Sequence, residues 1–242
     1  MAETFHVLAV LDGNRRYAKK QEWQNLWEGH RAGYETFRQI LKSIWTYDVT
    51  HFSAWVLSMN NVLNRPKTEL QFLYHLLDHA FDEVALELEK NQNDIQFYAV
   101  GEWQEFLPDT LCARIVSLQN STAHCRKKVL TLLLAYDGKK DLMNAINRSL
   151  FPASISRAMI LPNITPLITE KLIKKYLSTG HLPDIDLMIR TGGEPHLSEG
   201  LPLWQMANAH LYFTETLWPE FTETELAKAI QEFKSRERRL GA

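Results

Sequence analysis

The fold depends on one stretch near the start of the chain, His6-Val7-Leu8-Ala9-Val10-Leu11-Asp12-Gly13-Asn14-Arg15-Arg16-Tyr17-Ala18. The six residues from His6 are mostly apolar, which is typical of a buried strand in a parallel sheet. Residues 12–14 then turn the chain, and the basic segment 15–20 restarts it as a helix. The stretch therefore predicts an α/β sheet with a ligand site at the carboxyl end of its first strand.

The turn in this stretch has the chemistry of an anion site. The first N–H groups of a helix have no partner within the helix, and the helix dipole adds about half a positive charge there, so a phosphate can bind. Arg15 and Arg16 would add full charges beside it. Asp12 stands where a carboxylate next to phosphates usually holds a divalent cation. An ordinary turn followed by solvated arginines is the alternative, and this stretch alone fits both.

Length and composition restrict the class of protein. With 242 residues, 45% of them hydrophobic, the chain can fold as one domain spanning residues 1–242. A net charge of −2 argues against a nucleic-acid surface, so a phosphate site would be local and its ligand small. Cys112 and Cys125 lack the spacing of metal ligands, which argues against a structural zinc site. Two isolated cysteines are typical of a reducing compartment such as the cytoplasm. Without a signal peptide or an apolar run near the roughly 20 residues of a membrane span, we expect a soluble or at most peripheral protein.

Strands and helices alternate along the rest of the chain. Further strands are expected at 51–57, 95–100, 129–136, 185–189 and 209–213, and helices at 29–47, 66–91, 109–124, 139–150, 169–178 and 223–238. A polar loop is expected over 58–66, and segment 151–166, with three prolines, is the least regular. This order predicts a single α/β domain with a central, mostly parallel six-stranded sheet flanked by helices.

The helix expected over 66–91 carries a wide apolar stripe. Its members are Leu70, Leu73, Leu76, Leu77, Ala80, Phe81, Val84 and Leu88. Helical spacing fits both plain core and one wall of an apolar channel, and core is the commoner answer.

A second chemical motif lies at Asp186-Leu187-Met188-Ile189-Arg190-Thr191-Gly192-Gly193-Glu194. A strand there ends in an arginine, a hydroxyl and two glycines. The backbone can then approach a ligand closely while Arg190 offers a two-pronged contact to a phosphate. Because parallel strands share one carboxyl edge, this motif is expected at the same end of the sheet as Asp12.

These motifs together resemble the cis-prenyltransferases, the undecaprenyl diphosphate synthase family. The resemblance rests on the opening stretch, on 29–33, on Asn64-Arg65-Pro66 with Glu69, on 135–138 and on 186–221, which ends in Trp218-Pro219-Glu220-Phe221. It implies a homodimer that condenses isopentenyl diphosphate with an allylic prenyl diphosphate to a cis-polyprenyl diphosphate, using Mg²⁺. Contact with a membrane would then arise through the lipid product.

The resemblance also implies roles for individual residues. Asp12, Asn14 and Asn61 would be catalytic, and Asp12 and His210 would hold the metal. The residues expected to bind substrate are Gly13, Arg15, Arg16, Tyr17, His30, Ser58, Arg65, Arg190, Glu194, His196, Ser198 and Arg239. For His30 a purely structural role is the alternative, since a lone histidine is usually structural.

The sequence departs from the family pattern at several places, mostly on the isopentenyl diphosphate side. It has no arginine between Gln21 and Glu28, His196 stands where an arginine is expected, and His210 stands where a metal-binding glutamate is expected. An active cis-prenyltransferase is the leading hypothesis. The alternatives are a catalytically weak or regulatory subunit of a prenyltransferase complex, and a relative doing other chemistry on an allylic diphosphate, such as head-to-middle condensation or diphosphate removal. A nucleotide-binding Rossmann protein is disfavoured because no G-x-G-x-x-G follows a strand.

Overall fold

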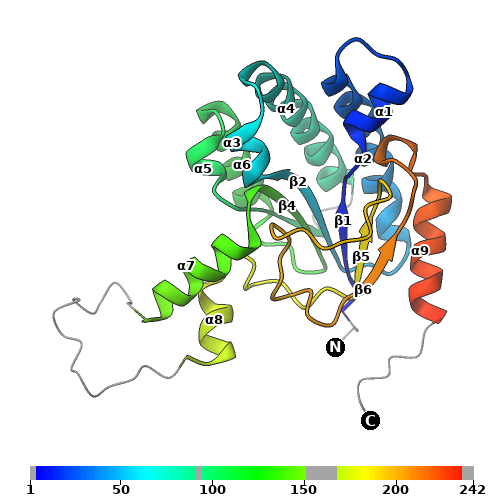
Figure 1. Ribbon diagram of the computed structural model, residues 1–242. Helices are drawn as coiled ribbons and strands as arrows, with labels where there is room; N and C mark the ends of the chain where they lie inside the picture. The colour runs from blue at the N-terminus through cyan, green and yellow to red at the C-terminus, as the bar shows by residue number, and fades with distance from the viewer. Residues whose placement is uncertain (1–3, 91–93, 151–167, 236–242) are drawn as a thin grey trace.

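The computed structural model, which describes residues 4–90, 94–150 and 168–235, is built around a six-stranded sheet (Figure 1). The strands lie in the order β3-β4-β2-β1-β5-β6, and every neighbouring pair is parallel. Their bounds are His6–Val10 (β1), His51–Ser58 (β2), Ile95–Val100 (β3), Lys128–Tyr136 (β4), Leu187–Arg190 (β5) and His210–Phe213 (β6). The predicted α/β class and parallel sheet are confirmed.

Helices connect the strands and cover the sheet (Figure 1). Their bounds are Asn14–Lys20 (α1), Gly29–Ser43 (α2), Met59–Asn64 (α3), Lys67–Lys90 (α4), Trp103–Phe106 (α5), Asp109–Thr122 (α6), Gly138–Leu150 (α7), Glu170–Tyr176 (α8) and Glu223–Ser235 (α9). Short 3₁₀ turns lie at Leu26–Glu28, Ile44–Thr46 and Trp218–Glu220. No helix in the described ranges is long and apolar enough to cross a membrane.

Strand β1 is buried on both faces, as its apolar run predicts. Val7 and Ala9 pack into the larger core, which α2, α4, α6 and α9 complete, whereas Leu8 and Val10 pack into a smaller core on the other face. β1 therefore sits in the middle of the molecule, and its carboxyl end leads straight into the turn at residues 12–14.

One element differs in kind from the expectation. The segment 58–66, predicted as a polar loop, contains the helix α3, so that prediction is wrong. The Ser58 hydroxyl caps this helix by accepting from the Asn61 N–H at 3.1 Å, and Met59 and Val62 are buried. A cap and two buried apolar side chains stabilise a helical turn that the asparagines alone do not favour.

Several boundaries also shift. α2 ends at Ser43 rather than near residue 47, and a 3₁₀ turn follows it. The fifth strand begins at Leu187 and continues to Arg190, so that this arginine is itself part of the strand. The irregular segment 151–166 and the end of the helix expected over 223–238 fall outside the described residues.

His6 is a fully buried polar residue at the start of β1. Its Nδ1 lies 3.0 Å from the Pro183 carbonyl and must donate there, so Nε2 accepts from the Ser53 hydroxyl at 2.8 Å. Burial lowers the pKa of His6 to about 3. The ring is therefore neutral in the folded protein.

This buried histidine is expected to make stability depend on pH. The unfolded chain takes up the proton near pH 6.5 but the native ring does so only near pH 3, so the free energy of unfolding falls as pH drops below 6.5. The change is about 1.4 kcal/mol per pH unit below pH 6.5. Between pH 7.5 and 5.0 the free energy of unfolding of the wild type should therefore fall by about 2 kcal/mol more than that of His6→Gln. Urea denaturation at the two pH values measures this, with His124→Gln, at an exposed position, as control. Equal losses in the wild type and His6→Gln would contradict it.

Candidate active site

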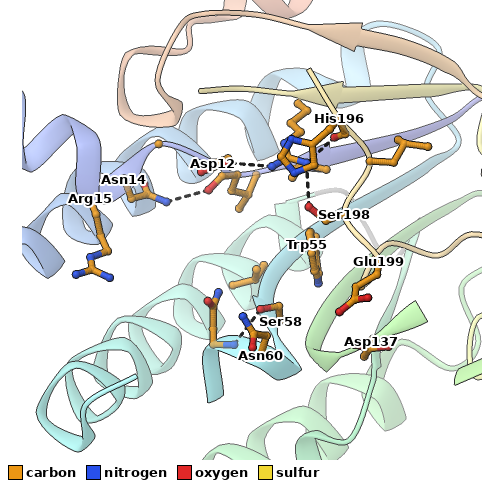
Figure 2. A pocket seen from close by; sticks show the side chains of 18 of the residues that line it. Asp12, Asn14, Arg15, Trp55, Ser58, Asn60, Asp137, His196, Ser198 and Glu199 are labelled. Atoms are coloured by element: carbon orange, nitrogen blue, oxygen red, sulfur yellow. Dashed lines mark hydrogen bonds and ion pairs between the residues drawn. The ribbon is translucent and has the colours of Figure 1, made fainter. Parts of the chain in front are cut away.

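A polar cavity of about 730 Å³ opens at the carboxyl edge of the sheet (Figure 2). The ends of β1, β2 and β5 reach it, together with the start of α1 and the segment 196–200. In parallel α/β sheets this edge is where ligands bind. The described structure thus places a cavity where the sequence predicts one.

The turn between β1 and α1 forms one wall of this cavity. Gly13 has φ +108°, a left-handed conformation that a side chain rarely adopts, and a Cβ there would lie 2.9 Å from Leu217 Cδ2. The Asn14 amide donates to the Leu11 carbonyl at 2.9 Å, and the Trp218 N–H donates to the Asp12 carbonyl at 2.9 Å. These bonds fix the turn, so Asp12 and Asn14 are held in place before any ligand arrives.

Helix α2 packs directly on the same turn. A Cβ at Gly29 would lie 1.9 Å from the Asn14 carbonyl oxygen, and one at Gly33 would lie 2.0 Å from Asn14 Oδ1. That Oδ1 is buried and accepts no hydrogen bond within the part of the chain that the structure describes. Gly29 is therefore required by the close approach of two backbones, and Gly33 by the close approach of the Asn14 side chain.

Asp12 joins the two sequence motifs through ion pairs. Its Oδ1 lies 2.9 Å from Arg16 Nη2 and its Oδ2 lies 3.1 Å from Arg190 Nη2. Arg16 also lies 3.1 Å from Glu194 Oε1. The expectation that the motifs meet at one edge of the sheet is confirmed, and both arginines face the cavity around one carboxylate.

Arg190 is the more buried of the two arginines, with 5% of its surface exposed. Its Nη1 donates to the His196 carbonyl at 2.6 Å and to the Ser198 hydroxyl at 2.9 Å. Gly192 has φ +92°, and a Cβ there would lie 2.6 Å from Arg16 Nη2, so this glycine leaves room for the neighbouring arginine. The guanidinium group of Arg190 is consequently fixed in direction.

The opposite wall comes from the end of β2, from α3 and from the segment that follows it. Ser58 and Asn60 lie on this wall, away from His196 and Ser198 (Figure 2). Arg65 donates from Nη1 to His30 Nε2 at 3.1 Å and pairs with Glu69 Oε1 at 3.2 Å. Burial, followed by the charges of Arg65 and Arg15, lowers the pKa of His30 to about 3.

A small apolar cavity of about 80 Å³ adjoins the polar one. The residues that line both cavities are Leu11, Asn14, His30 and Val56. The residues of the α4 stripe that line the apolar cavity are Leu73, Leu76, Leu77 and Ala80, whereas Phe81, Val84 and Leu88 are buried in the core without lining it. Part of the stripe therefore lines a small apolar cavity and part of it belongs to the core.

Most residues expected at the site do line the polar cavity. They are Asp12, Gly13, Asn14, Arg15, Arg16, His30, Ser58, Asn61, Arg65, Arg190, His196 and Ser198. Tyr17 does not line it and packs edge-on against Trp23, with ring centroids 5.6 Å apart. Glu194 does not line the cavity but contacts two residues that do, Arg16 and His196, and Arg239 lies outside the described residues.

His210 lies elsewhere in the fold. It begins β6, in register with Leu187, whereas Asp12 follows Val10, which is level with Arg190 at the other end of β5. Its Nε2 lies 3.9 Å from Glu232 Oε1 on α9. Within one chain, Asp12 and His210 do not come together as ligands of the same ion.

The described residues show no ready-made cluster of metal ligands at this site. Among residues 4–90, 94–150 and 168–235, no group of three or more histidine, cysteine or acidic side chains is arranged to hold one. Mg²⁺, however, is commonly held by one or two carboxylates together with substrate phosphates. Asp12, with 33% of its side chain exposed in the cavity, fits that arrangement.

Other lining residues were not expected from the sequence. They include Trp55, Asn60, Asp137 and Glu199 (Figure 2). Asp137 directly follows β4, so the rule that ligand sites form at the carboxyl ends of strands could have found it. Glu199 pairs with Lys139 at 2.7 Å, a contact between distant segments that leaves no local signal.

Arginines line the polar cavity, and apolar side chains line the cavity next to it. The two cavities together suit a ligand with an anionic head and an apolar tail. Comparison with known proteins refines this class. A family described as putative undecaprenyl diphosphate synthase matches residues 10–241. A "Ditrans,polycis-undecaprenyl-diphosphate synthase ((2E,6E)-farnesyl-diphosphate specific)" from Acinetobacter baylyi is 36% identical over 236 residues, 98% of this chain and 90% of the relative. The isoprenyl transferase of Wolinella succinogenes is 35% identical over 240 residues, 99% of this chain and 97% of the relative.

A solved structure agrees with these sequence matches. Lavandulyl diphosphate synthase from Lavandula x intermedia, in complex with dimethylallyl diphosphate, has a TM-score of 0.86 and 29% identity, covering 98% of each chain. The chain belongs to the undecaprenyl diphosphate synthase family of prenyltransferases.

Proposed function

We propose that this protein condenses isopentenyl diphosphate with an allylic prenyl diphosphate to form a cis-polyprenyl diphosphate. The observation that carries the proposal is the junction of the two cavities at Asn14 and His30. A diphosphate head fits among the arginines on one side of this junction, and a prenyl tail fits among the leucines of α4 on the other. Membership of the prenyltransferase family supports the same reaction.

The two substrates divide the polar cavity between them. The allylic diphosphate binds at the turn of Gly13 and Asn14 with Arg16, from where its tail enters the apolar cavity. Isopentenyl diphosphate binds at Arg190 and Ser198, whose side chains are already hydrogen-bonded to each other. Guanidinium groups held in a fixed direction contact phosphate oxygens without losing much side-chain entropy.

The reaction breaks the allylic carbon–oxygen bond, and the electron pair leaves with the diphosphate. The double bond of isopentenyl diphosphate then attacks the allylic carbon, and loss of a proton leaves a new cis double bond. Arg16 and the N–H groups of the turn stabilise the charge that develops on the departing diphosphate. Asp12 would hold Mg²⁺, which adds positive charge beside that group when bound. Asn14 and Asn61 are placed to orient the substrate heads.

The direct test is incubation of the purified protein with farnesyl and isopentenyl diphosphates, with and without Mg²⁺, followed by mass analysis of the products. We expect products that grow in steps of five carbons and that require Mg²⁺. A protein that binds both substrates but forms no product would contradict the proposal and indicate a weak or regulatory subunit.

A second candidate is other chemistry on an allylic diphosphate, namely head-to-middle condensation or diphosphate removal. The structural likeness to lavandulyl diphosphate synthase favours this alternative, as does His196 at a position expected to hold an arginine. The same assay with dimethylallyl diphosphate alone separates the candidates. A branched ten-carbon diphosphate or a free alcohol as the main product would replace the leading proposal.

A homodimer in a reducing compartment, in contact with membrane only through its lipid product, completes the proposal. Among the strands of the described residues, β6 pairs with β5 alone and ends the sheet, so its outer edge can face a second copy. Cys112 and Cys125 are free thiols, in keeping with cytoplasmic conditions.

Enlarging Ala80 is expected to shorten the product. Ala80 lines the apolar cavity, whose 80 Å³ is the room of about three water molecules, so the three extra carbons of Ala80→Leu fill space that the tail needs. Product mass should fall by at least one five-carbon unit at nearly unchanged stability. Val84→Phe is the matched control, because overpacking this core position should cost about 1 to 3 kcal/mol without changing the product. If Ala80→Leu destabilises the protein and leaves the product unaltered, Ala80 belongs to the core only.

Replacing His210 is expected to leave metal dependence unchanged, because Asp12 lies at the carboxyl edge of the sheet and His210 at its amino edge. His210→Ala and His210→Glu should both show the Mg²⁺ activation curve and the pH profile of the wild type. Higher activity in Mg²⁺ with His210→Glu, or an acid limb near pH 6.5 that His210→Ala removes, would instead show that His210 is a ligand in an assembly of two chains.

A further inference from the structure

Three titratable or charged side chains from separate elements meet at the junction of the two cavities. His30 lies in the first turn of α2, Arg65 follows α3, and Glu69 lies in the first turn of α4. Arg65 Nη1 is 3.1 Å from His30 Nε2 and 3.2 Å from Glu69 Oε1. His30 Nε2 and Glu69 Oε1 are 3.8 Å apart, too far for a hydrogen bond. The cluster therefore depends on Arg65 as its central member.

Glu69 is the most buried member, with 2% of its side chain exposed. A carboxylate at that depth is costly without a compensating charge, and Arg65 supplies one. Glu69 Oε1 accepts no hydrogen bond among the described residues, so it holds Arg65 through charge. The result is a guanidinium group fixed with one N–H directed at His30.

That hydrogen bond determines where the imidazole carries its proton. A guanidinium group can only donate, so His30 Nε2 must accept and carries no proton. The proton of the neutral ring is then on Nδ1. The pKa of His30, lowered to about 3 by burial and by the charges of Arg65 and Arg15, agrees with a neutral ring at physiological pH.

The charged groups around this ring come from each neighbouring element. Those facing it from other elements are Arg15 of α1, Arg65 and Glu69, and those beside it along the chain are Glu28 and Arg31, which pair with each other at 3.8 Å. Positive charge thus prevails near the ring itself, which opposes formation of an imidazolium ion.

We propose that Glu69 and Arg65 are positioning residues that hold His30 as a neutral imidazole with its proton on Nδ1, so that the ring at the junction of the two cavities carries no charge. This inference rests on the proposed function for its purpose. The allylic carbon becomes positive next to the departing diphosphate, and an imidazolium ion at the entrance of the tail would repel it. A neutral ring lines the same entrance without adding positive charge.

The first test measures the tautomer directly. Long-range ¹H–¹⁵N spectra of histidine-labelled wild-type protein, with His30 assigned by its loss in His30→Gln, are expected to show Nδ1 protonated and Nε2 unprotonated. Both signals should stay constant from pH 8 to 5. A proton on Nε2, or titration of the ring within this range, would overturn the proposal. This measurement needs no turnover, so it can succeed or fail independently of the proposed reaction.

Variants then separate the hydrogen bond from charge. Arg65→Met removes both, so the ring should populate both tautomers and its pKa should rise from about 3, although burial, the larger cause of the shift, still keeps it below the ordinary value of about 6.5. Glu69→Gln should loosen Arg65 and mix the tautomers as well. Arg15→Met removes a nearby charge but leaves the hydrogen bond, so the proton should stay on Nδ1. An unchanged tautomer in Arg65→Met would contradict the assigned role of the guanidinium group.

The pH profile of kcat/KM gives a readout that general damage to the structure would not produce. Arg65→Met should lose more kcat/KM between pH 7.5 and pH 5.5 than the wild type does, because removing the guanidinium charge raises the pKa of His30 toward this range while burial still holds it below 6.5. Arg65→Lys, which can still donate to Nε2, should restore the wild-type profile in this range. An extra loss that persists in Arg65→Lys, or is absent from Arg65→Met, would count against the proposal.

Discussion

Replacing Asp12 by Ala is expected to lower kcat/KM for prenyl transfer by about 100- to 1000-fold while the melting temperature changes little. Loss of a metal-holding carboxylate removes several kcal/mol of transition-state stabilisation, at about 1.4 kcal/mol per tenfold in rate. The side chain is 33% exposed at the end of β1, so its removal leaves no cavity in the core. Steady-state kinetics in Mg²⁺ and thermal unfolding measure the two effects.

Two further variants test whether the charge of Asp12 is what matters. Asp12→Asn keeps the volume but not the charge, so it should lose nearly as much activity as Asp12→Ala. Asp94→Asn, which removes an exposed carboxylate paired with Lys127, should keep full activity. If Asp12→Ala retains more than a tenth of the wild-type activity, Asp12 is not the metal-holding group.

Replacing Arg190 by Met is expected to raise KM for isopentenyl diphosphate about 100-fold and also to destabilise the fold. A hydrogen bond to a charged group contributes about 1.5 to 3 kcal/mol, so losing a two-pronged phosphate contact readily accounts for that change. Arg190 is 5% exposed and bonds to Ser198, whereas the side chain of Arg16 is 42% exposed. Arg16→Met should therefore impair catalysis without a comparable loss of stability.

The pattern of kinetic effects tests which substrate each arginine binds. Arg190→Met should affect KM for isopentenyl diphosphate, and Arg16→Met should affect the allylic substrate. Arg190→Lys should recover only part of the loss, because an ammonium group keeps the charge but not the planar geometry. A rise in KM for the allylic substrate alone in Arg190→Met would reverse the assignment of the two sites.

The sheet and the meeting of the two motifs could be predicted because both follow from rules that act along short stretches. An apolar run followed by Asp12-Gly13 predicts a buried strand and a turn, and parallel strands bring Asp12 and Arg190 to the same edge. The helix α3 could not be predicted this way, since it depends on a cap by Ser58 and on the burial of Met59 and Val62 in the finished fold.

Contacts between distant segments also could not be predicted from the sequence. His30, Arg65 and Glu69 each belong to a sequence motif. The hydrogen bond between Arg65 and His30, however, depends on how α2 and α4 pack in the fold. For His210 the sequence already indicated a position away from Asp12, because a strand expected over 209–213 places His210 at the amino end of that strand. The family motif suggested a metal ligand near Asp12, whereas the position in the strand placed His210 at the other end of the sheet.

The packing of α2 on the first turn has a consequence for engineering this protein. Glycine inside a helix ordinarily costs about 1 kcal/mol relative to alanine, so Gly→Ala in helices is a common route to greater thermostability. At Gly29 and Gly33 a methyl group would collide with Asn14 at 1.9 and 2.0 Å. At these positions the absence of a side chain lets α2 pack against the backbone and the side chain of Asn14, and a stabilising screen that ignored this would displace the residue at the junction of the two cavities.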